Sequence, residues 1–111
     1  MIEKVIKRHL DSQLGVPSFY EHEEDMPERC VLIEKTGSGR RDFARSATFT
    51  FQSYAGSMQE AAELNEAVKV AVDSLIGLDA ISGVRLNSDY NFTDTETKRY
   101  RYQAVYDIYY F

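Results

Sequence analysis

The C-terminal segment KRYRYQAVYDIYYF (98–111) constrains the fold more than any other part of the chain, because it alternates two kinds of side chain. Side chains of a β-strand point in turn to opposite faces, so this period of two predicts one long strand. One face would carry Tyr100, Tyr102, Ala104, Tyr106, Ile108 and Tyr110, and the other Arg99, Arg101, Gln103, Val105, Asp107 and Tyr109.

Four further segments predict extended structure. DFARSATFTFQSY (42–54) also alternates, which places Phe43, Ala47, Phe49 and Phe51 on a core face and Thr48, Thr50 and Gln52 in water. GVRLNSDYNF (83–92) aligns Val84, Leu86, Tyr90 and Phe92, with Ser88 interrupting the pattern. RCVLIEK (29–35) predicts a covered strand and VPSFY (16–20) a short extended piece, joined by an acidic surface loop at 21–28.

Two segments predict helices. Apolar residues recur at helical spacing from Ile2 to about Leu14, and Gly15 would end that helix. The second helix begins with Ser57, because SMQE (57–60) has the form of a capping box. Its burial is expected from Leu64, Val68, Leu75 and Ile76, with Gly77 as a left-handed C-terminal cap.

These elements predict an α+β fold with an antiparallel-rich sheet of about four to five strands and two helices packed on one face. The 111 residues suit a single domain spanning 1–111. A hydrophobic content of 43% argues against disorder, and the net charge of −5 disfavours nonspecific nucleic-acid binding. The single cysteine, Cys30, together with the absence of a leader-like start or a membrane-spanning run, indicates a protein kept in a reducing cytoplasm.

The glycine-rich stretch EKTGSGRRDF (34–43) raises the question of phosphate binding. A phosphate-binding loop would open a helix and carry a lysine and a hydroxyl at fixed positions, whereas a strand follows here. We therefore interpret Gly37 to Arg41 as a loop between two strands, in which the glycines permit positive φ.

No catalytic constellation is recognisable in the sequence. Cys30 is interpreted as a small core residue and His9 as a structural histidine at the border of a helix, and the acids around His22 lack metal-ligand spacing. We accordingly expect no enzyme activity, no cofactor and no metal.

Tyrosine and arginine alternate at the start of the last strand, a composition typical of protein interfaces. Stacking on single-stranded nucleic acid is the alternative use of such residues, and the acidic balance of the chain makes it the weaker one.

Several segments resemble the small proteins of siphophages and prophages of Gram-positive bacteria known as minor capsid or tail-completion proteins, which resemble the tail terminators. They are VLIEKTGSG (31–39), ATFTFQSYA (47–55), EAAELNEAVKVAV (60–72) and, most specifically, RLNSDYNFTDTETKRYRYQAVYDIYY (85–110). The resemblance covers nearly the whole chain and rests on sequence texture.

The resemblance implies a compact tail-terminator-like fold and a ring, expected to be a hexamer, that caps the tail tube, stops its polymerisation and presents the surface for head attachment. The implied partners are other copies of the chain, the tail-tube protein and a head-completion or connector protein, while DNA passes through the lumen without specific binding and no membrane is involved. The implied location is the tail–head junction of the virion, with assembly in the bacterial cytoplasm.

On this interpretation the residues expected to contact a neighbouring subunit or the tube are Gly37, Ser38, Gly39, Arg40, Arg41, Arg99, Arg101 and Tyr109. Basic patches near RRD or KRYR would meet acids such as Glu21, Glu23, Glu24 and Asp25 of a neighbour. Two alternatives stay open: a connector-side head-to-tail joining protein, and a small ligand-binding or regulatory module.

Overall fold

The computed structural model describes residues 1–41 and 44–111, and the elements follow the order that the sequence predicts. They are α1 (Ile2–Gln13), β1 (Ser18–Phe19), β2 (Cys30–Arg41), β3 (Ala44–Ala55), α2 (Met58–Asp73), the 3₁₀ helix η1 (Ser74–Gly77), β4 (Ile81–Asn91) and β5 (Tyr100–Tyr110). Asp42 and Phe43, which the strand pattern includes, lie outside the described residues.

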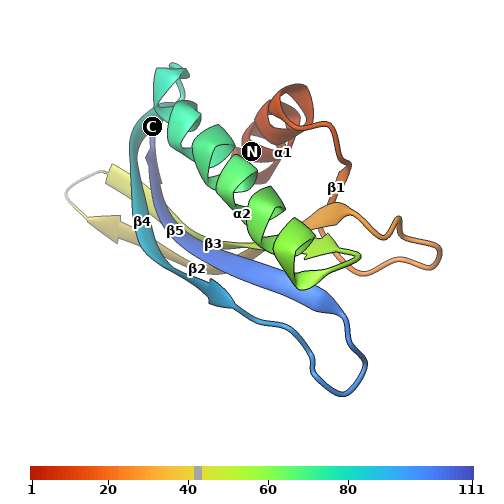
Figure 1. Cartoon of the computed structure of the whole chain (residues 1–111). Helices are drawn as coiled ribbons and strands as arrows, with labels where there is room; N and C mark the ends of the chain where they lie inside the picture. Colours follow the sequence, from red (N-terminus) through yellow and green to blue (C-terminus); the bar gives the residue numbers. More distant parts are fainter. Residues whose placement is uncertain (42–43) are drawn as a thin grey trace.

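The strands form one sheet in the order β1-β2-β3-β5-β4 (Figure 1). β1 pairs in parallel with β2, and all other pairings are antiparallel. Both helices lie on the same face of the sheet, and α2 crosses the central strands (Figure 1). The predicted α+β class, the mostly antiparallel sheet and the two helices on one face are therefore confirmed.

The core lies between this sheet face and the helices. Its buried apolar side chains come from one face of each element: Ile2, Ile6, Leu10, Val31, Ile33, Ala47, Phe49, Phe51, Leu64, Val68, Val72, Leu75, Ala104, Tyr106 and Ile108. The ring of Phe51 packs edge-on against that of Tyr106, with centroids 5.9 Å apart. These residues follow the period of two in the strands and the helical period in α1 and α2, as predicted.

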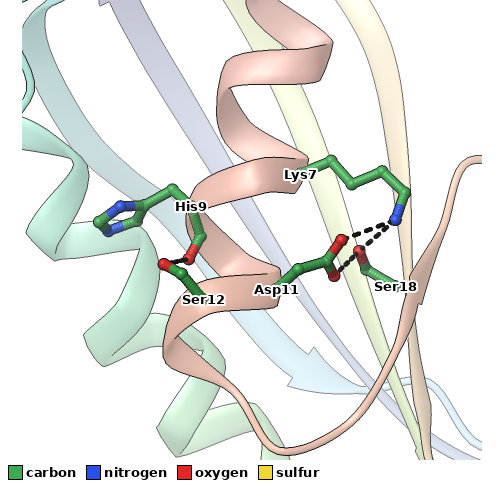
Figure 2. A network of polar contacts seen from close by, with 5 residues as sticks. All are labelled: Lys7, His9, Asp11, Ser12 and Ser18. Carbon is green, nitrogen blue, oxygen red and sulfur yellow. Dashed lines mark hydrogen bonds and ion pairs between the residues drawn. The ribbon is translucent and has the colours of Figure 1, made fainter.

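A polar network fixes α1 to β1 (Figure 2). The Lys7 ammonium donates to a carboxylate oxygen of Asp11 at 2.8 Å and to the Ser18 hydroxyl at 3.2 Å, and Ser18 donates to the other Asp11 oxygen at 2.5 Å. On the other side of the helix, His9 Nε2 lies 2.7 Å from the Ser74 hydroxyl. This contact joins α1 to η1, so His9 has the structural place that the sequence indicates.

The second helix begins as predicted and ends differently. The amide of Glu60 donates to the Ser57 hydroxyl at 3.2 Å, so Ser57 is the N-cap. Gly77 is not a left-handed cap: α2 ends at Asp73, η1 follows, and the described glycines all have negative φ. The tighter winding of η1 rotates the side chains, so Leu75 is buried whereas Ile76, predicted to be buried, is 55% exposed.

The stretch from Gly37 to Arg41 is strand, which corrects the predicted loop. Gly37 pairs with Thr48, Gly39 with Ser46 and Arg41 with Ala44, so β2 continues after an irregularity between Lys35 and Gly37. The bulge absorbs one residue and lets both strands keep pairing beyond the helices, on the left of Figure 1. Gly37 and Gly39 therefore lie in a strand ladder instead of a turn.

The predicted alignment along 83–92 is also corrected. Val84 and Leu86 lie opposite Ile108 and Tyr106 of the core face, but a register shift between Leu86 and Ser88 moves Tyr90 opposite Gln103 on the other face. An extra residue reverses the inward and outward positions of everything that follows it. Tyr90 and Phe92 therefore lie on the face opposite the core, and both are about 40% exposed.

Candidate interaction surface

We call the face of the sheet opposite the helices the uncovered face. It carries the strand side chains that do not point into the core. The strand registers arrange them in rows that cross β2, β3, β5 and β4 in that order. Three successive rows are Cys30–Tyr54–Arg101–Phe92, Leu32–Gln52–Gln103–Tyr90 and Glu34–Thr50–Val105–Ser88. The face is thus aromatic and cationic at one end and polar in the middle.

The middle of the uncovered face is less exposed than the alternation predicts. Thr50, Gln52 and Gln103 are each less than 10% exposed, which corrects the expectation that Thr50 and Gln52 face water. Gln52 donates to the Gln103 side-chain oxygen at 2.8 Å, and Gln103 donates to the Tyr90 hydroxyl at 2.5 Å. These hydrogen bonds provide partners for the buried amide groups.

Arginine and aromatic side chains form a continuous cluster at the end of this face near the start of α2. We call Arg99, Tyr54, Arg101 and Phe92 the arginine–aromatic stack. The Arg99 guanidinium lies 4.8 Å from the centre of the Tyr54 ring, and the Arg101 guanidinium lies 5.8 Å from that ring and 4.4 Å from the Phe92 ring. Guanidinium groups and aromatic rings therefore alternate along the stack, and each neighbouring pair is held by a cation–π contact.

The two arginines of the stack differ in how firmly they are held. Arg101 is half-buried, and it donates from Nη1 to the Tyr54 hydroxyl at 3.0 Å and from Nε to the Phe92 carbonyl at 2.7 Å. Arg99 is exposed, and its ladder contact is a single β-bridge with Asp94. Arg101 thus orders the stack, whereas Arg99 is presented to solvent.

The acidic loop at 21–28 covers part of the stack. A second apolar cluster of Cys30, Leu32 and Tyr54 packs against Phe19 and Met26, so the loop closes over the β2 side of the uncovered face. The Glu28 carboxylate lies against Gly56, where an added Cβ would sit 2.5 Å from its nearer oxygen. A larger residue at position 56 would therefore make the flexible Glu28 side chain move aside.

A cleft of about 340 Å³ lies between the acidic loop and the stack. Its walls include His22, Glu23, Asp25, Glu28, Tyr54 and Arg99. Glu23 and Asp25, two of the four acids predicted to meet basic patches of a neighbouring subunit, therefore line one cleft with Arg99 and Lys98 of the same chain. No sequence pattern marks this cleft, because the loop and the stack are far apart in the chain.

The other predicted contact residues lie at the opposite end of the sheet. Tyr109 is eight residues along β5 from Arg101, which corresponds to about 26 Å of strand. Its ring packs on Gly83, where an added Cβ would lie 3.1 Å from Cδ2. Tyr109 shares the row of Ser46 and Gly39, so it lies at the same end of the sheet as Gly37, Ser38, Gly39 and Arg40, with β3 between them; the Arg41 side chain is outside the described residues.

The structure therefore divides the predicted contact residues into two groups instead of one. Arg99 and Arg101 belong to the stack, together with Tyr54 and Phe92, which the sequence reasoning did not select. The signal for Phe92 was the odd residue Ser88, which marks the bulge that turns Tyr90 and Phe92 to the uncovered face.

Cys30 is fully buried, and burial raises the pKa of its thiol, although Arg99 opposes this effect. In residues 1–41 and 44–111, no three His, Cys, Asp or Glu side chains are placed to hold a metal ion. Neither helix in this part of the chain combines the length and the apolar content needed to cross a bilayer.

Comparison of the chain with protein-family models finds no match, and comparison with curated proteins finds no significant similarity.

Proposed function

We propose that this chain is a tail terminator: a structural protein that forms a ring on the tail tube of a siphophage or prophage, stops tail polymerisation and provides the head-attachment surface. The observation that carries the proposal is the placing of two exposed groups at opposite ends of one elongated molecule, which measures 44 × 24 × 24 Å. A protein that joins two different partners needs two separate contact surfaces.

Each end has a composition suited to protein contacts. The arginine–aromatic stack presents the exposed guanidinium of Arg99 and the partly exposed ring of Phe92 beside the buried Tyr54, and arginine and aromatic residues are enriched in interfaces. The far end of β2 offers the exposed residues Ser38, Gly39 and Arg40. The net charge of −5 suits a ring through which DNA passes without binding.

The decisive experiment measures mass by light scattering over a range of concentrations, for the chain alone and with purified tail-tube protein. A closed ring, or a monomer that becomes a ring on tube ends and stops tube growth, supports the proposal. A chain that stays monomeric and leaves tube growth unchanged contradicts it. Binding to the connector in place of the tube would identify a connector-side joining protein.

The cleft between the acidic loop and the stack favours a second candidate function, a small ligand-binding module. It combines acids, an arginine and an aromatic ring within about 340 Å³, and binding sites bring such polar groups together. Native mass spectrometry of the purified chain would detect a bound small molecule, and Arg99→Ala should abolish that binding. A chain that carries no ligand and assembles on tubes would exclude this candidate.

A further inference from the structure

The sheet has two open edges. β4 pairs only with β5, and β1 covers only Val31 and Leu32 of β2. In the described part of the chain, β2 from Glu34 onward therefore pairs on one side only, with β3. An open edge presents unpaired N–H and C=O groups that can template another strand.

The two open edges run in opposite directions. Three antiparallel pairings separate β2 from β4, namely β2 with β3, β3 with β5 and β5 with β4, so β4 is antiparallel to β2. A second copy placed beside the first by a head-to-tail rotation would bring its β4 antiparallel to the first copy's β2. Such a contact joins two different surfaces and generates a ring when the rotation closes.

The charges at the two edges are complementary. Glu34 on β2 and Arg85 on β4 are both exposed, and no described side chain makes an ion pair with either. Both lie on the uncovered face: Glu34 shares the row of Thr50, and Arg85 shares the row of Asp107 and Thr48. The two rows are neighbours, so these opposite charges lie on opposite edges and about 7 Å apart along the strand direction.

We propose that β4 of one copy adds to the β2 edge of the next copy as an antiparallel strand, with Arg85 pairing with Glu34 across the contact. The uncovered faces of successive copies then form one continuous surface. This inference rests on the ring of the proposed function and names the surface through which the ring closes.

The bulges restrict which strand can add. β4 has irregularities between Ile81 and Gly83 and between Leu86 and Ser88, and β2 has one between Lys35 and Gly37. Straight ladders are limited to short stretches such as Ser88–Asn91, which disfavours random edge pairing. The ion pair between Glu34 and Arg85 then sets the register of the contact.

A charge exchange tests the proposal on the purified full chain. Glu34→Arg and Arg85→Glu should each raise the concentration needed for self-association roughly tenfold at low salt, because each places like charges together. The double variant should restore association to near the wild-type level. Lys4→Glu, on the outer side of α1, is the matched control and should change nothing.

A covalent test follows from the same geometry. Within one chain, β2 and β4 are three strand spacings apart, about 14 Å, which is too far for a disulfide. In Glu34→Cys/Arg85→Cys, oxidation should therefore link different copies and give a ladder of species that ends at the ring size. Either single variant should give dimers at most.

The outcomes separate this inference from the proposed function. If both single charge variants assemble and cap tubes like the wild type, or if no ladder forms, the edge contact is wrong while the terminator role stands. If the ladder forms and the double variant restores association, but the chain does not stop tube growth, the edge contact stands and the terminator role is wrong.

Discussion

At the residue scale, Arg99 and Arg101 occupy equivalent positions of one alternating pattern and have different surroundings. Arg101 lies between the Tyr54 and Phe92 rings and donates two hydrogen bonds within the chain. Arg99 lies over the Tyr54 ring and is exposed. The first residue therefore contributes to folding and the second is available to a partner.

Replacing the two arginines should separate these roles. We expect Arg101→Ala to lower the free energy of unfolding by about 1–2 kcal/mol, because it removes two hydrogen bonds and two cation–π contacts. Arg99→Ala should change it by less than about 0.5 kcal/mol. Urea denaturation followed by circular dichroism measures both, and equal losses would contradict the assignment.

Cys30 and Tyr106 predict a loss of stability at alkaline pH. Burial raises the pKa of the Cys30 thiol above its ordinary value of 9.0. Burial, followed by the hydrogen bond to Asp73, raises the pKa of Tyr106 far above its ordinary value of 10.0. In both cases the folded state keeps a proton that the unfolded chain releases, so this stabilisation is complete below pH 9 and is lost as pH rises further.

The urea midpoint should therefore fall as the pH rises from 9 to 11. Tyr106→Phe has no phenol to titrate at this position, so its midpoint should fall less over the same interval. A variant whose midpoint fell as steeply as that of the wild type would show that other groups cause the alkaline loss.

At the element scale, the sequence signal for the start of α2 is strong and the signal for its end is weak. Ser57 accepts from the Glu60 amide, which fixes the first turn. At the other end, Ser74 donates to the Ala71 carbonyl at 2.6 Å, and the chain changes to 3₁₀ winding. Gly77 lies at the end of η1, after α2 has already ended at Asp73. The glycine therefore does not cap α2, although its position in the sequence suggested a cap.

Removing the N-cap should destabilise the whole domain. We expect Ser57→Ala to cost about 1 kcal/mol, because the Glu60 amide loses its acceptor. Ser57→Asp should retain nearly all of the stability, since a carboxylate can accept the same hydrogen bond and suits a helix N-terminus. Thermal denaturation of the two variants compares them, and equal midpoints would refute the assignment of the cap.

At the scale of the whole molecule, the long strands place two exposed groups at the two ends of one sheet. β3 and β5 pair over eleven consecutive positions, so they form a stiff connection between the stack and the far ends of β2 and β3. Substitutions at one end should therefore leave the other end intact. This is the arrangement expected of a protein that contacts two partners at once.

The two ends should fail separately in a reconstituted tail assay. We expect Arg40→Ala combined with Arg41→Ala to weaken one contact, with the tube or with a neighbouring copy, and Arg99→Ala to weaken head joining or tube capping independently. Circular dichroism would verify folding, and electron microscopy would score tube length and joined heads. Normal assembly of both variants would remove these residues from the contact surfaces.

The sequence by itself determined the elements and their order, because its signals are local. Period two in 98–110, the helical stripe from Ala61 to Val72 and the cap at Ser57 each depend on residues a few positions apart. The same locality placed Cys30 in the core, where the structure has it fully buried. It also placed Arg99 and Arg101 on the face opposite the core side chains of β5.

Only the tertiary structure decided which residues come together, because that depends on register between distant strands. The bulge at Leu86/Ser88 turns Phe92 to the uncovered face, and the pairing of Tyr54 with Arg101 completes the stack. The bulge at Lys35/Gly37 allows β2 to continue, so Gly37 and Gly39 pair with β3. This pairing depends on a distant strand and is therefore invisible in the local sequence. A single extra residue reverses every position beyond it, and its energetic benefit appears only when the neighbouring strands are in place.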